Sequence, residues 1–231
     1  MKIIKNEKLI TRNSKIGQWT SLAGLVVLGG GMFVTWRYPE LFNYALIALL
    51  AGFILTQISI HLGNRFGRSP RPDESLDSAL KGLPGDFTIY HFTAPAAHLL
   101  VGPAGIWALL PYRQTGNVTY RNGRWKMGGG GFMQGYMRIF GQEGIGRPDV
   151  EADSDIKSVR KELAEHMPVE EVPDVQAVLV FTGEPVELEA VDAPLPAMKA
   201  KQLKEFMRRG AKDRQLTEAQ LQRINSILTE N

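Results

Sequence analysis

The chain has 231 residues, enough for one domain and an anchor, and it contains no cysteine. The lack of cysteine excludes a disulfide-stapled secreted fold, a thiolate zinc site and a cysteine nucleophile. The net charge of +3 is unevenly spread, because residues 1–72 carry nine Lys/Arg against two acidic residues and residues 73–231 carry 18 against 22. A nucleic-acid-binding domain usually has a basic excess, so the acidic balance of residues 73–231 disfavours nucleic acid as a partner.

The first 62 residues predict a basic segment followed by two membrane-spanning helices. Residues 1–15 are rich in lysine and arginine, residues 16–36 carry no charge, and residues 41–62 are uncharged except for His61 near their end. At about 1.5 Å per residue, each apolar stretch is long enough for the roughly 30 Å hydrocarbon core of a bilayer. We therefore expect a transmembrane hairpin over residues 16–62, with the lipid bilayer as its partner. The alternative is a helical hairpin buried in a soluble protein.

The charges around this hairpin predict its orientation. Lysine and arginine gather on both outer flanks, in residues 1–15 and in the linker 63–72, whereas the connecting turn has Arg37 opposed by Glu40. Because basic flanks stay on the cytoplasmic side, we expect a multi-pass protein of the cell (inner) membrane with both termini in the cytoplasm.

Residues 73–128 predict a helix followed by strands. Asp73 is placed to cap a helix over residues 74–83, and residues 86–92 alternate as a strand does. Two apolar runs that begin at His98 and at Gly105 are joined by a Gly-Pro-Ala-Gly turn, and their apolar character predicts central strands. An Asn-Gly pair at 122–123 predicts a further hairpin between residues 117–120 and 125–126.

The rest of the chain predicts helices that alternate with strands. Four glycines at 128–131 lack the Gly-Lys-Ser/Thr of a phosphate-binding loop. The apolar residues of 132–140 predict a helical stripe that is a core or partner face, or else an interfacial membrane helix. We then expect a helix over 156–167 capped by Asp153 or Ser154. Further expected elements are strands at 175–181 and 186–191, a helix over 198–207, and a C-terminal helix in 210–231 with a Thr217–Gln220 capping box.

The region from His98 resembles a known family. The run His98-Leu-Leu-Val-Gly-Pro-Ala-Gly-Ile-Trp-Ala-Leu, followed by Gly116 and by Gly123-Arg124-Trp125, is similar to the NERD family of nuclease-related domains. The resemblance covers most of residues 73–209. It implies an α/β fold in which a mixed sheet is flanked by helices, as in the restriction-endonuclease-like PD-(D/E)XK superfamily.

The resemblance also implies where catalytic groups would lie. Active members of that superfamily place an Asp at the end of one strand and Glu-x-Lys on the next, and the carboxylates hold Mg²⁺ for phosphodiester hydrolysis. The corresponding positions here are Ala97, Leu110 and Tyr112. None of these side chains supplies a carboxylate or an amine, so we expect no catalytic residue, no metal ion and no cofactor.

Three functions remain open from the sequence. The first is a membrane-anchored, non-catalytic NERD-like cytoplasmic domain that serves as a binding or scaffolding module, or as an accessory subunit of a membrane assembly. The second is a nuclease-related protein with relocated metal ligands that binds or hydrolyses nucleic acid. Its local basic strip would consist of Arg113, Arg121, Arg124 and Lys126. The third is a membrane protein that associates with a partner, or with itself, through residues 132–140.

Five polar residues are candidates for contacts with a ligand: His98, Arg113, Gln114, Arg121 and Arg124. His91 and His98 could form a zinc pair on paper. We expect instead that they are structural residues, because strand residues seven apart face opposite sides of a sheet.

Overall fold

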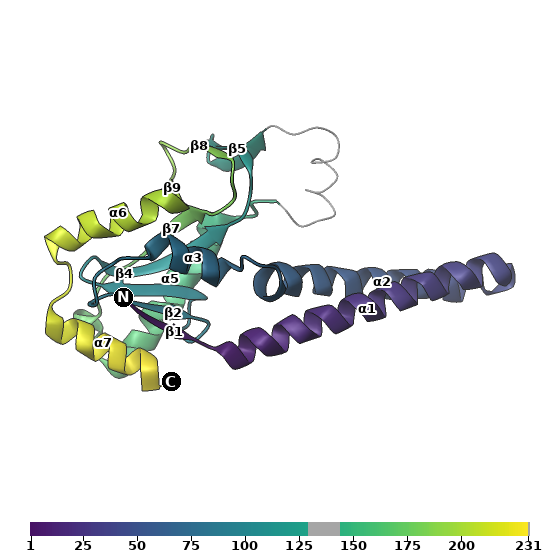
Figure 1. The fold of residues 1–231 in the computed structure, drawn as a ribbon, viewed down its shortest axis with the longest axis horizontal. Coiled ribbons are helices and arrows are strands. Elements are labelled where there is room, and N and C mark those ends of the chain that lie inside the picture. The colour runs from purple at the N-terminus through teal and green to yellow at the C-terminus, as the bar shows by residue number, and fades with distance from the viewer. Residues whose placement is uncertain (129–143, 231) are drawn as a thin grey trace. The chain divides into compact units, whose positions relative to one another are not determined.

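The computed structural model describes residues 1–128 and 144–230 and divides into two compact units. The helical unit is Glu7–Arg71, and the α/β unit combines Met1–Asn6 with the chain from Pro72 onward. The helical unit is therefore an insertion within the sequence of the α/β unit (Figure 1).

The helical unit consists of two long antiparallel helices. Helix α1 spans Glu7–Arg37 and α2 spans Phe42–Leu62. A short 3₁₀ turn, Pro39–Leu41, joins them, and a π-helical turn, Gly63–Gly67, follows α2. Both expected helices are confirmed, but α1 begins nine residues before the uncharged stretch because its N-terminal turns carry the basic residues.

Small residues allow the two helices to pack closely. The buried residues of α1 recur at every seventh position: Ile10, Gly17, Gly24 and Gly31. A methyl group added to Gly31 would lie 3.2 Å from Cβ of Ala48 on α2, so no larger side chain fits without displacing the partner helix. Ser59 also donates a hydrogen bond to the carbonyl of Gly17 over 2.8 Å. Close backbone approach of this kind is how helices associate in lipid.

Both helices are long and apolar enough to span a membrane. Only 11% of the apolar window of each is buried, whereas the core helix of a soluble protein is mostly buried. Their outward faces expose large apolar side chains such as Trp36 (80%), Trp19 (70%) and Leu25 (69%). An apolar surface of this extent indicates contact with lipid or with another protein.

We predict that a bulky side chain at Gly31 separates the helices and that the same change at Gly30 does not. Gly31 faces α2, whereas a Cβ at Gly30 meets nothing within 4 Å, so Gly30→Leu is a matched control on the adjacent position. The measurement is the rate of disulfide formation between cysteines introduced at Gly24 and Leu55. Their Cβ atoms would lie 3.4 Å apart, close to the disulfide range of about 3.5–4.5 Å. Gly31→Leu should slow cross-linking several-fold. Equal rates in the two variants would contradict this packing.

The α/β unit is built on a mixed six-stranded sheet in the order β1-β2-β3-β4-β7-β9. The strands β2, β3 and β4 form an antiparallel meander, while β1 runs parallel to β2, and β7 and β9 continue parallel from β4. The bounds of the strands are β1 Lys2–Lys5, β2 Thr88–His91, β3 His98–Gly102, β4 Gly105–Tyr112, β7 Val175–Phe181 and β9 Ala197–Lys199.

A three-stranded sheet, β6-β5-β8, extends the unit beyond β4. Its strands are β5 Gly116–Arg121, β6 Arg124–Gly128 and β8 Val186–Glu189. The Asn122-Gly123 pair takes positive φ at both residues, +54° and +70°, so the predicted two-residue hairpin turn is confirmed.

Helices cover both faces of the six-stranded sheet. Helices α3 (Pro72–Leu80) and α6 (Ala200–Gly210) pack on the face that carries Leu100, whereas α5 (Pro148–His166) and α7 (Glu218–Glu230) pack on the face that carries Leu99. Successive residues of β3 and β4 thus enter opposite cores, which explains why both strands are apolar throughout. The expected mixed sheet flanked by helices is confirmed, with β3 and β4 as central strands.

Several local expectations are wrong. No strand was predicted within the basic N-terminus, and residues 2–5 form β1. Asp73 lies in the first turn of α3 rather than at its cap. Helix α5 begins at Pro148, so neither Asp153 nor Ser154 caps it. Proline suits a first helical turn because its missing N–H is not needed there.

Two other expectations have different outcomes. The Thr217–Gln220 capping box is confirmed, with the Gln220 N–H donating to the Thr217 hydroxyl over 3.3 Å and the Thr217 N–H donating to Gln220 Oε1 over 2.9 Å. The apolar stripe expected over residues 132–140 lies outside the described residues.

Candidate functional site

A group of charged and histidine side chains is buried between α3 and the β1-β2-β3 edge of the sheet. We call it the Lys5 cluster, and its members are Lys5, Asp73, Asp77, His91 and His98. Asp73 and His91 are fully buried and His98 is 4% exposed. Buried charges need partners, because their desolvation is costly.

Lys5 lies between two carboxylates. Its Nζ donates a hydrogen bond to Asp73 Oδ2 over 3.1 Å and also forms an ion pair with Asp77. The second carboxylate oxygen of Asp77 lies 3.1 Å from Nε2 of His91, and Nδ1 of His91 lies 2.8 Å from Nδ1 of His98. The cluster is thus a continuous chain of contacts from β1 through α3 to β3.

Local structure brings these residues together. The parallel register pairs Lys5 with His91, and the antiparallel register pairs His91 with His98. Asp73 and Asp77 are four residues apart, so they share one face of α3. The backbone holds β1 in place as well, since the Asn6 N–H donates to the His91 carbonyl over 3.1 Å.

The cluster shifts the pKa of both groups at its centre. Burial alone would lower the pKa of Lys5, but its hydrogen bonds to Asp77 and Asp73 outweigh that effect and raise it. Burial alone would raise the pKa of Asp77, but its contacts with His91 and Lys5 outweigh it, and the pKa is lowered. Both shifts favour the charged forms, so the ion pair persists at neutral pH.

The contacts of the two histidines determine which ring nitrogens donate and which accept. A carboxylate only accepts hydrogen bonds, so Nε2 of His91 donates to Asp77. One hydrogen fits between the two Nδ1 atoms at 2.8 Å. With both rings neutral, Nδ1 of His98 therefore donates to Nδ1 of His91.

This arrangement corrects the expectation that His91 and His98 face opposite sides. They lie on different strands of a hairpin, directly opposite one another, and the residue after His91, Phe92, has a positive φ of +58°. Within residues 1–128 and 144–230, no group of three or more His, Cys, Asp or Glu side chains is arranged to hold a metal ion.

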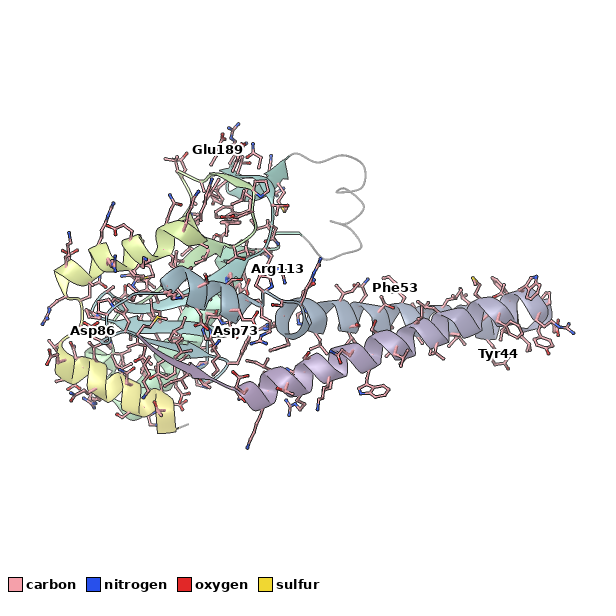
Figure 2. The ribbon with its side chains drawn as sticks, in the orientation of Figure 1. Tyr44, Phe53, Asp73, Asp86, Arg113 and Glu189 are labelled. Atoms are coloured by element: carbon pink, nitrogen blue, oxygen red, sulfur yellow. The ribbon has the colours of Figure 1, made fainter. Side chains whose placement is uncertain are left out.

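The other candidate contact residues lie elsewhere in the α/β unit. Gln114 follows β4 and donates to the carbonyl of Gly144 over 3.2 Å, and Arg113 precedes it. Arg121 and Arg124 are paired across the β5-β6 turn, and Arg121 binds Glu189 of β8 over 3.0 Å. Figure 2 labels Arg113 and Glu189 in this region and Asp73 in the Lys5 cluster. The structure therefore joins only His98, of the five candidates, to the cluster.

Two of the three positions that the family resemblance singled out, Leu110 and Tyr112, are occupied by packing residues. Leu110 is 3% exposed and belongs to the core on the α5 face of the sheet. Tyr112 stacks on Phe181 of β7, and its hydroxyl donates to Glu151 of α5 over 2.8 Å. Burial raises the pKa of Tyr112, and the neighbouring Glu151 adds to this, so the phenol stays neutral. Ala97 accepts a hydrogen bond from the Phe92 N–H through its carbonyl.

Comparison of the chain with protein-family models, with curated proteins and with solved structures gives no match.

Sequence reasoning did not bring the five cluster residues together. Lys5 was interpreted as a membrane-flanking charge and Asp73 as a helix cap, and Asp77 was not singled out. His91 was considered with His98 as a zinc pair, and both were expected to be structural. The sequence did contain a signal for the histidine pair. His91 and His98 lie immediately before and after a short loop, and the two residues at equal distances from the middle of a hairpin loop lie opposite each other on the antiparallel strands.

We predict that Asp77→Asn destabilises the α/β unit. The variant leaves Lys5 and His91 facing a neutral amide, which costs about 1–3 kcal/mol and lowers the midpoint of thermal unfolding by roughly 3–10 °C. Asp153→Asn is the matched control, because it removes an exposed carboxylate whose partner Lys157 is 73% exposed. The measurement is near-ultraviolet circular dichroism of the full chain in detergent. Equal midpoints for the two variants would contradict the role of the Lys5 cluster.

We also predict that the destabilisation caused by Asp77→Asn depends on pH. Because the pKa of Asp77 is lowered in the folded chain, its carboxylate stabilises the fold above the unfolded-state pKa, about 3.9, and this contribution disappears as the pH falls through the folded-state value. The difference in free energy of unfolding between the parent and Asp77→Asn should therefore shrink from pH 5 to pH 3. A difference that stays constant over this range would show that the carboxylate charge is not its source.

Proposed function

We propose that the chain is a membrane-anchored, non-catalytic member of the nuclease-related domains. In this proposal α1 and α2 cross the cell membrane, both termini lie in the cytoplasm, and the α/β unit binds or scaffolds a protein partner within a membrane assembly. Helix α3, strands β2 to β6, helix α5 and strand β7 follow one another along the chain, and their mixed sheet is flanked by helices as the resemblance implies, which supports a restriction-endonuclease-like fold.

One observation carries the non-catalytic part of the proposal. Leu110 and Tyr112 occupy two of the positions where the resemblance implies metal-binding and phosphate-orienting groups, and both are built into the α5-side core. A carboxylate at Leu110 would be a buried charge among apolar side chains, which is strongly unfavourable. Relocation of the chemistry would thus require a new site rather than a small adjustment of this one.

The charge distribution supports a protein rather than a nucleic-acid partner. Arg121, on the candidate basic strip, is already paired with Glu189, and the chain from residue 73 has more acidic than basic residues. Neither feature favours the phosphate backbone.

The test is a nuclease assay together with cross-linking in native membranes. Purified full-length chain in detergent is incubated with single- and double-stranded DNA and RNA in Mg²⁺ or Mn²⁺. We expect no nuclease activity that co-purifies with the protein. Cross-linking in its own membranes should give a discrete complex with another protein or with a second copy.

Cleavage that follows the protein would overturn the non-catalytic proposal. The variant Arg113→Ala/Gln114→Ala separates the two sources of cleavage, because it removes the polar side chains that directly follow the nuclease positions. A contaminating nuclease is unaffected by this change, whereas activity of the domain at this location is reduced.

A further inference from the structure

The first turns of α1 carry a line of basic side chains. Lys8, Arg12 and Lys15 are spaced by four and three residues, and Trp19 follows four residues later. This spacing places all four on one face of the helix. All four are exposed, and Trp19 is 70% exposed. We call these residues the α1 stripe.

The packing of the hairpin directs the α1 stripe outward. At about 100° per residue, the stripe lies roughly 180° around the helix from the buried positions Ile10 and Gly17. Gly17 packs against Leu62 of α2, where an added Cβ would lie 3.1 Å from that side chain. The glycine seam that holds the helices together thus turns the stripe away from α2.

The length of α1 places the stripe at the edge of a bilayer. The helix has 31 residues, about 46 Å at 1.5 Å per residue, whereas the hydrocarbon core needs about 20 residues. The uncharged part begins at Ile16, so Lys8, Arg12 and Lys15 extend beyond it at the level of the headgroups. Trp19 lies where aromatic side chains meet the interface.

We propose that the α1 stripe is a binding surface for the phosphate groups of anionic phospholipids in the leaflet at the N-terminal end of α1. This inference rests on the proposed membrane-spanning role of α1 and α2. The three cations complement the negative headgroups, and Trp19 continues the same face into the acyl region. A lipid is favoured over a soluble polyanion because the stripe runs without a break into an exposed apolar helix face.

The experiment measures lipid preference next to Trp19. The full chain with Trp36→Phe is reconstituted in phosphatidylcholine vesicles that contain acyl-brominated phosphatidylglycerol or acyl-brominated phosphatidylcholine, and quenching of tryptophan fluorescence is compared. A Trp36→Phe/Trp19→Phe chain supplies the signal of the remaining tryptophans, which is subtracted. We expect phosphatidylglycerol to be preferred about fivefold or more, and the preference to fall as salt is raised.

Two matched triple variants test whether the cations of the α1 stripe cause the lipid preference. Lys8→Gln/Arg12→Gln/Lys15→Gln should bring the preference close to one. The control Lys157→Gln/Arg160→Gln/Lys161→Gln removes the same charges from exposed positions of α5 and should leave the preference unchanged. An equal preference in the two triple variants, or no preference in the parent, would overturn the inference.

Two further outcomes are distinguishable. Alkaline extraction is applied first. A chain that is extracted from the vesicles contradicts both the membrane-spanning proposal and the lipid-binding surface. A chain that resists extraction but shows no preference for phosphatidylglycerol contradicts only the lipid-binding surface. An oligonucleotide can also be added to the parent chain in pure phosphatidylcholine vesicles. If it binds the parent chain but not the Lys8→Gln/Arg12→Gln/Lys15→Gln variant, the α1 stripe binds nucleic acid instead, and the inference is overturned.

Discussion

The architecture depends on the placement of one ammonium group, that of Lys5, between the carboxylates of Asp73 and Asp77. Lys5 ends the strand that precedes the helical unit, and Asp73 lies in the first turn of the helix that follows it. The ion pairs therefore join the points where the chain leaves and re-enters the α/β unit. Since Asp77 also binds His91 of β2, and His91 contacts His98 of β3, the same chain of contacts links both points to the middle of the sheet.

The helical unit and the α/β unit are each stabilised by their own packing. The helical unit is held together by its own glycine seam, and the large apolar side chains of its outer faces are exposed. The α/β unit buries one core on each face of its sheet, and one of these cores contains Leu110 and Tyr112, two of the three positions that the family resemblance singles out. The proposed membrane-anchored binding module is consistent with both features.

The parts of the fold that could be predicted are those specified by local patterns. The apolar runs around Gly102 and Gly105 indicated central strands, and the Asn122-Gly123 pair indicated its hairpin turn. Both signals are local, because the repeat of apolar residues and the turn preference depend only on residues that are adjacent in the sequence. Strand β1 was not predictable in this way: it has four residues and pairs with β2 more than 80 positions away. The histidine contact was missed because it depends on where the chain reverses, at Phe92, rather than on the spacing within one strand.

We propose that α1 and α2 cross the membrane as a hairpin and that both ends of the hairpin and the α/β unit lie in the cytoplasm. The chain has no cysteine, so single cysteines introduced at Glu40, in the turn between the helices, or at Lys157, exposed on α5, report position alone. In sealed right-side-out vesicles, a membrane-impermeant maleimide should label Glu40→Cys directly and Lys157→Cys only after the vesicles are opened. Labelling of both positions from the same side of the intact membrane would contradict the account.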